Sequence, residues 1–133
     1  MSEPFIQLLA ELLEDEGTAT LGTNLFLTEM PETPDNATMI TTSGTVDQRK
    51  DYEIRDIFVD FWIRNTDSAQ AYATAQAIWD KLHRRANYQL PGAIYVYFGY
   101  ATTNIEDFDK DTNQRKVVKL QMRFTYRPLE ATS

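Results

Sequence analysis

The chain of 133 residues contains no cysteine and only one histidine, His83. The absence of cysteine excludes disulfide frameworks, iron–sulfur clusters and thiolate zinc sites. The single histidine excludes a multi-histidine metal site and catalysis that needs two imidazoles. Long apolar runs are absent as well, so we expect no membrane-spanning segment, and the opening Met-Ser-Glu-Pro has no signal-peptide pattern. These absences remove most catalytic classes.

Basic residues are scarce: 13 Lys and Arg stand against 20 Asp and Glu, a net charge of −7. Residues 1–60 hold 13 acids and 3 bases, whereas residues 61–133 hold 7 acids and 10 bases. Phosphate contacts need clustered Lys and Arg, so this chain is a poor candidate for specific nucleic-acid binding. The uneven charge fits either ordinary solvation or self-association, in which the acidic part of one copy meets the basic part of the next.

The length and composition fit one domain covering residues 1–133, with 42% apolar and 25% charged residues. Apolar periodicity predicts two amphipathic helices, over 2–16 and 67–85, and Asp67 is the expected cap of the second. Alternation and β-branched content predict strands over 20–27, 37–42, 53–64, 93–100 and 117–127. The order α-β-β-β-α-β-β indicates an α+β domain, with two helices packed on a mostly antiparallel sheet of about five strands.

Two of the expected strands carry informative faces. The strand over 53–64 has one apolar face, with Phe61 at its centre, and a second face that mixes aromatic and charged residues. This pattern predicts a central strand that is covered on both sides. Strict alternation over 93–100 places Tyr95 and Tyr97 on one face and Phe98 and Tyr100 on the other.

No combination of residues predicts a catalytic, cofactor or metal site, so we expect a protein that is not an enzyme and needs no cofactor. The sequence Asp107-x-Asp109-x-Asp111 matches the first three ligand positions of a helix–loop–helix calcium site. The match then fails, because Thr112 stands where glycine is needed and Val118 where a bidentate glutamate is needed. A solvated loop is the preferred interpretation, with a weak calcium site as the alternative.

Charged residues form three candidate interaction surfaces. Acidic residues end the first helix and fill residues 101–116, which we interpret as a polar loop; they are Glu14, Asp15 and Glu16, and Glu106, Asp107, Asp109 and Asp111. Basic residues form a row on one face of the last strand: Lys119, Arg123 and Arg127. Each group is either solvated surface or a partner contact. The basic row would suit an acidic partner, such as another copy.

Several short motifs occur in a characteristic order. They are Leu21-Gly22-Thr23-Asn24-Leu25-Phe26, Met30-Pro31, Pro34-Asp35-Asn36-Ala37, Phe61-Trp62-Ile63-Arg64 and Asp67-Ser68-Ala69-Gln70-Ala71-Tyr72. In this order, and behind a leading amphipathic helix, they resemble the tail terminator proteins of long-tailed bacteriophages, also called tail completion or minor capsid proteins. The resemblance runs from about Phe5 to Tyr126. None of the motifs is a catalytic signature.

The resemblance implies a virion assembly protein that forms a ring, usually of six copies, on the end of the tail tube. Such a ring stops tube growth and offers the surface that joins the head. The implied partners are further copies, the tail tube protein and a head-completion or connector protein, with no membrane and no cofactor. The implied location is the tail or neck of the virion, after assembly in the host cytoplasm. Other classes left open are a head-completion or stopper protein, a tube subunit, and a small enzyme or ligand-binding domain.

If DNA crosses such a ring without specific binding, the channel wall should not hold phosphates. Each Lys or Arg contact to phosphate adds attraction that would slow passage. We therefore expect at least one of the two acidic groups to face the channel, with the group in residues 101–116 as the better candidate. The basic row is then expected to contact a neighbouring subunit or another partner.

Overall fold

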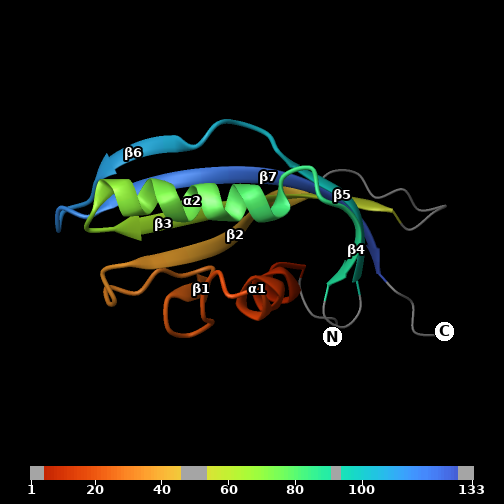
Figure 1. Cartoon of the computed structure of the whole chain (residues 1–133), viewed down its shortest axis with the longest axis horizontal. Helices are drawn as coiled ribbons and strands as arrows, with labels where there is room; N and C mark the ends of the chain where they lie inside the picture. Colours follow the sequence, from red (N-terminus) through yellow and green to blue (C-terminus); the bar gives the residue numbers. More distant parts are fainter. Residues whose placement is uncertain (1–4, 46–53, 91–93, 129–133) are drawn as a thin grey trace.

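The computed structural model describes residues 5–45, 54–90 and 94–128 (Figure 1). Its elements are α1 (Phe5–Asp15), β1 (Leu25–Leu27), β2 (Ala37–Thr45), β3 (Arg55–Asn65), α2 (Ser68–Leu82), β4 (Ala86–Leu90), β5 (Ile94–Ala101), β6 (Glu106–Lys110) and β7 (Lys116–Pro128). The predicted α+β class, with two helices and a mostly antiparallel sheet, is confirmed. The described sheet has seven strands rather than five.

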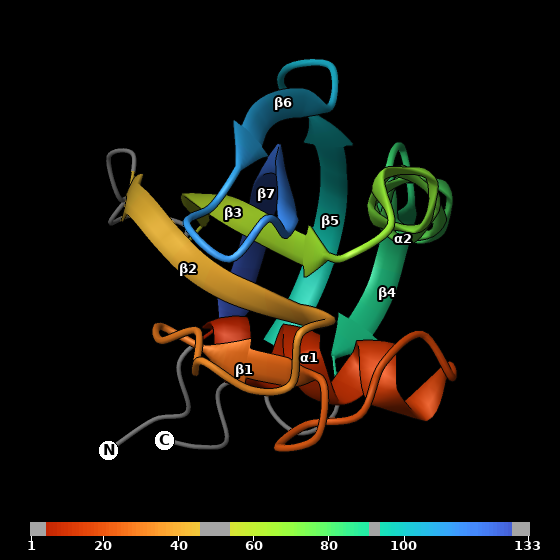
Figure 2. The ribbon, with the colours of Figure 1, turned by 90° about the vertical axis from the view of Figure 1, so that its left-hand side faces the viewer.

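The strands lie in the order β1-β2-β3-β7-β5-β4, and β6 pairs with β7 beside this path. The β1–β2 pairing is parallel, whereas the other strand pairs are antiparallel. The first residues of β7 pair with β6 and its last residues with β5, so β7 joins both halves of the sheet. Figure 2 shows the sheet curving around α1, with α2 to one side of it. We call the helix-covered side of the sheet the inner face and the opposite side the outer face.

The core lies between the inner face and the two helices. Along the β3–β7 ladder, Phe61 pairs with Leu120 and Val59 with Met122, and all four side chains are fully buried. Helix α2 adds a stripe of buried residues at helical spacing, and the leucine-rich face of α1 closes the other end of the core. The predicted apolar face of 53–64 therefore packs as expected.

Glycine is required at one position of this core. A Cβ atom built on Gly99 of β5 would lie 2.4 Å from Cδ1 of the Phe124 ring. Phe124 is fully buried, with its ring centre 5.2 Å from that of Phe5 on α1, so it has little room to move away. A residue without a side chain lets the strand pass directly over the ring.

The second helix is shorter than predicted. Asp67 caps it as expected, because its side chain accepts a hydrogen bond from the Ala69 N–H at 2.9 Å. The helix ends at Leu82 rather than residue 85, since His83 is already extended and Arg84 has a positive φ of 65°. This turn reverses the chain into β4, which pairs with β5 and which the sequence did not predict.

The segment 101–116 is not the continuous loop that we predicted. Residues Glu106–Lys110 form β6, which is hydrogen-bonded to the start of β7. The sequence favours a loop because acidic residues have low strand propensity. Pairing with the basic start of β7 overrides that propensity: Lys116 forms an ion pair with Asp107, and Lys119 lies opposite Glu106.

Two strand predictions also change in detail. The strand expected over 20–27 is limited to Leu25–Leu27, because the Leu25 N–H bonds back to the Thr20 carbonyl in a turn that contains Gly22 at φ 81°. In β5, a bulge between Val96 and Phe98 breaks the alternation. The prediction that separated Tyr95 from Phe98 and Tyr100 is therefore wrong: all three lie on the outer face, where they pair with Arg127, Thr125 and Arg123 of β7.

Candidate functional site

The connection between β1 and β2, residues 31–36, is fastened to the sheet by two buried arginines; we call it the pinned loop. Arg64, at the end of β3, is 5% exposed. Its Nη2 atom donates to the carbonyl oxygens of Pro31 and Pro34, each at 2.6 Å, and its Nε donates to the Asp35 carbonyl at 3.1 Å. One guanidinium thus satisfies three backbone acceptors that this proline-rich loop cannot pair within itself.

The second arginine is Arg115, just before β7, which is 3% exposed. Its Nη1 donates to the Glu32 carbonyl at 2.7 Å, and its Nε donates to the Asp111 carboxylate at 2.9 Å. The carboxylates of Glu32 and Asp35 lie 3.4 Å from its guanidinium, with those side chains 82% and 62% exposed. Burial lowers the pKa of Arg64, and the nearby charge of Arg115 lowers it further. The loop is held in place and presents acidic groups to solvent.

Sequence reasoning missed this arrangement. In the sequence, Arg64 is only the last residue of a motif, and Arg115 lies in the segment predicted to be a loop. The sequence does contain a hint of this contact. Each arginine adjoins an apolar strand, and the chain also has a short acidic segment with two prolines that such arginines could bind. The loop lies about 30 residues from Arg64 and about 80 residues from Arg115 along the chain, so no local pattern reveals these contacts.

The outer face carries the predicted basic row, and two of its three members bind buried carboxylates of the same chain. Arg123 lies 3.2 Å from Asp56, and Lys119 lies 3.9 Å from Asp60. Both aspartates are at most 5% exposed. The hydrogen bond to Asp56 raises the pKa of Arg123. Arg127 instead lies over the Tyr95 ring, 5.6 Å from its centre. The row is one coherent face, with much of its charge neutralised internally.

Aromatic side chains share the outer face with these ion pairs. The β5 bulge places Phe98 opposite Thr125 and Tyr100 opposite Arg123, with ring centres 5.9 Å apart. On the other half of the sheet, Phe108 of β6 packs edge-on against Trp62 at 5.2 Å. Phe98 and Phe108 are 40% and 48% exposed. The outer face therefore offers apolar area beside partly neutralised charge, a composition typical of protein contacts.

The acidic group at the end of α1 is divided. Glu16 forms a bidentate pair with Arg85, with both N–O distances 3.1 Å, and it lies 3.7 Å from Lys81. This pair ties the end of α1 to the end of α2. Glu14 and Asp15 are exposed and form no ion pair within the described residues.

The acidic group of 106–111 is divided in the same way. Asp107 pairs with Lys116 and Asp111 with Arg115, and hydrogen bonds from these two residues lower the pKa of each carboxyl group. Glu106 and Asp109 are exposed and form no ion pair within the described part of the chain. The two acidic groups do not converge on one site.

The lone histidine has a structural position. The His83 Nδ1 atom accepts a hydrogen bond from the Ala101 N–H at 2.9 Å, and its ring packs on Trp79 with centres 4.6 Å apart. Residues 5–45, 54–90 and 94–128 contain no group of three or more side chains that could hold a metal ion. Neither described helix has the length and apolarity needed to cross a membrane.

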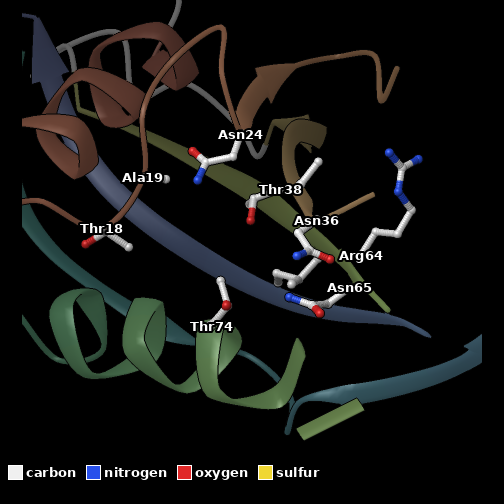
Figure 3. Close-up of a pocket in the computed structure, with 10 residues that line it drawn as sticks. Thr18, Ala19, Asn24, Asn36, Thr38, Arg64, Asn65 and Thr74 are labelled. Atoms are coloured by element: carbon white, nitrogen blue, oxygen red, sulfur yellow. The ribbon is translucent and has the colours of Figure 1, made fainter. Parts of the chain in front are cut away.

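A polar pocket of about 130 Å³ lies between the ends of β2 and β3, the chain after α1, and α2 (Figure 3). Three asparagines and three threonines supply its polar lining: Asn24, Asn36, Asn65, Thr18, Thr38 and Thr74. Arg64 contributes its stem, while its guanidinium points away toward the pinned loop. The pocket adjoins a shallow groove between the end of α1 and α2, which shares Thr18 and Thr74.

A solved structure with a similar fold is known. The structure is similar to a chain in the solved structure described as "Virion of native gene transfer agent (GTA) particle", with a TM-score of 0.59 and 17% sequence identity. The similarity covers 90% of each chain. At this identity the likeness shows a shared fold. No curated protein sequence matches the chain.

A protein-family comparison is more specific. The profile described as "Bacteriophage tail terminator protein" matches residues 12–128, which include β1 to β7, α2 and both buried arginines. The match spans well over half of the chain. The protein therefore belongs to the bacteriophage tail terminator family, whose members are structural components of the virion and not enzymes.

Proposed function

We propose that this protein forms a ring on the end of the phage tail tube, stops tube growth there, and provides the surface to which the head is joined. The family match over residues 12–128 is the observation that carries the proposal. The fold shared with a chain of a virion particle supports it. The ring is taken to have six copies, with the tail tube protein and a head-completion or connector protein as its partners.

Two surfaces suit the contacts that such a ring needs. The pinned loop has little conformational entropy to lose on binding, because buried arginines already hold it, and preordered loops bind with smaller ordering costs. The outer face combines exposed Phe98 and Phe108 with the basic row, so apolar burial and charge pairing can act together. We propose that Lys119, Arg123 and Arg127 lie in a subunit or partner contact.

The capping function can be tested with growing tail tubes. Purified protein is added to tubes assembled from the tail tube protein, more tube protein is supplied, and lengths are measured by electron microscopy. Capped tubes should keep their length, whereas untreated tubes should elongate. Equal elongation in both samples would reject the proposed function. Binding to the connector without binding to tubes would instead favour a head-completion protein.

We also propose that the channel wall is acidic or neutral, so that DNA passes without specific binding. The carboxylates available for it are those that form no ion pair within the described residues: Glu14, Asp15, Glu106 and Asp109. Asp107, Asp111 and Glu16 already neutralise basic residues of the same chain. A structure of the assembled ring checks this, and a channel lined by the basic row, with both acidic groups on the rim, would contradict it.

A further inference from the structure

We propose that the polar pocket between β2, β3 and α2 binds a carboxylate group supplied by another polypeptide. In each of the three asparagines that line it, the side-chain oxygen accepts a hydrogen bond from a backbone N–H of the same chain. The Oδ1 atom of Asn24 accepts from the Thr20 N–H at 2.7 Å, and that of Asn36 accepts from the Thr66 N–H at 3.1 Å. The Oδ1 atom of Asn65 accepts from the Asp67 N–H at 2.9 Å.

These bonds fix the orientation of each amide, because a backbone N–H can bond only to the oxygen end. Each Nδ2 group therefore keeps its two N–H donors, and none of them has a partner among the described residues. Figure 3 shows the three amides, which come from the β1 turn, the start of β2 and the end of β3, around one space. Asn24 and Asn36 are exposed and Asn65 is half-buried, so these donors face solvent and are open to an incoming ligand.

Two threonines of the lining are next to these amides. Thr38 of β2 is 4% exposed, its side chain has no hydrogen-bond partner among the described residues, and its hydroxyl faces the pocket (Figure 3). The Thr18 Oγ1 atom is buried and has no partner, but it points away from the other lining residues (Figure 3). The Thr38 hydroxyl is therefore the one that is open to a ligand or to water in the pocket.

The chemistry of the lining selects an anion. Its polar groups are amides and hydroxyls, and no carboxylate lines it; Arg64 contributes only its apolar stem. Hydrogen bonds to a charged acceptor are stronger than those to a neutral one. These donors therefore bind a carboxylate more strongly than a neutral group. The volume of about 130 Å³ is close to the roughly 150 Å³ in which a cavity holds benzene, so one acidic side chain fits.

The shape of the surroundings favours a polypeptide as the source. The groove that adjoins the pocket is lined by the small residues Gly17, Ala73 and Ala77, and also by Glu16, Gln70 and Lys81. A chain segment can lie in that groove while its acidic side chain enters the pocket. The inference that the carboxylate comes from a polypeptide rests on the proposed function, in which a second copy or another virion protein lies beside this one. Carboxylate binding itself does not depend on that function.

Acetate is the probe. The side-chain amide resonances of the whole protein are followed by NMR during titration with sodium acetate, against sodium chloride at equal ionic strength. We expect saturable shifts of the Asn24, Asn36 and Asn65 amide signals with acetate alone. Shifts that do not saturate, or that chloride reproduces, would show a pocket that holds only water and would overturn the inference.

Substitutions can separate binding from folding here. Asn36→Asp and Asn65→Asp keep the oxygen that accepts from the backbone but replace the donor with a negative charge, so acetate affinity should fall at least about tenfold. Asn87→Asp is the matched control, because the Asn87 Oδ1 accepts from the Tyr95 hydroxyl at 3.2 Å and lies outside the pocket lining. Equal acetate affinity in Asn36→Asp and Asn87→Asp would contradict the proposal.

Thr38→Val distinguishes a ligand-binding hydroxyl from one that stabilises the fold. Because the hydroxyl has no partner within the described chain, its removal should leave the melting temperature unchanged or higher while acetate binding weakens by about tenfold. A melting temperature lowered by several degrees would show an intrachain role and would count against the pocket as a site.

Sedimentation with and without acetate then identifies the source of the carboxylate. Self-association that acetate and Asn36→Asp both weaken indicates a second copy. Acetate binding by a protein that stays monomeric indicates another virion protein. Failure to cap tubes, combined with saturable acetate binding, would reject the proposed function and leave the carboxylate site standing.

Discussion

Replacing Arg64 with methionine is expected to lower the free energy of unfolding by about 2–4 kcal/mol. Methionine keeps the apolar stem but removes the donors that bind the carbonyls of Pro31, Pro34 and Asp35. Hydrogen bonds from a charged group contribute about 1.5–3 kcal/mol each, and their effects are not additive. A neutral carbonyl that is left buried without a donor costs about 1–3 kcal/mol. Water can reach part of this exposed loop, which keeps the total loss below the sum.

Chemical denaturation measures this loss, and amide exchange locates it. The Thr66 N–H, which bonds to the Asn36 side chain, should exchange faster in Arg64→Met, because the loop that positions Asn36 is released. Arg127→Met is the matched control: it removes a guanidinium that lies over Tyr95 on the outer face, and it should change stability by about 0.5 kcal/mol or less. Wild-type stability in Arg64→Met would show that the guanidinium does not support the pinned loop.

Phe61→Ala should cost about 3–5 kcal/mol of unfolding free energy, because it leaves a cavity at the centre of the core. Phe61 is fully buried, and its neighbours across the strands are Ile40 of β2 and Leu120 of β7, which are fully buried too. A typical domain has a stability of about 5–15 kcal/mol, so this one change removes a large share of it. The melting temperature should fall by about 10–20 °C.

Phe108→Ala is the control for the loss of a phenyl ring. Phe108 is 48% exposed, and its main described contact is the edge-on packing against Trp62. Its removal should cost about 1 kcal/mol, the scale of an aromatic pair. If Phe61→Ala melted within a degree of the wild type, Phe61 would lie outside the core and the β3–β7 register would be wrong.

The sequence predicted those elements whose apolar period is unambiguous. β7 alternates through Val118, Leu120, Met122, Phe124 and Tyr126, and the structure buries all five. α2 begins at the predicted cap, because an aspartate before a helical stripe satisfies a free N–H by itself. The α+β class follows from such local patterns, since each one needs only the residues within it.

The missed strands depended on partners far along the chain. β4 carries only one fully buried residue, Leu90, so its own pattern is weak and its strand form comes from pairing with β5. β6 has every residue exposed and a high acidic content, and it forms a strand because the basic start of β7 lies beside it. Propensity is a weak guide where an edge strand is formed by its neighbour.

The candidate sites also depend partly on sequence and partly on contacts between distant residues. The sequence by itself determined that the chain has no thiolate or multi-histidine chemistry, and it showed which residues are charged and in what order. Only the tertiary structure decided which charges are used internally: Arg123 with Asp56, Lys119 with Asp60, and Glu16 with Arg85. It also decided that two buried arginines fasten one loop and that three amides face one pocket. The physical reason is that ion pairs and shared pockets depend on distance in space, which folding sets between residues roughly 30 to 80 positions apart.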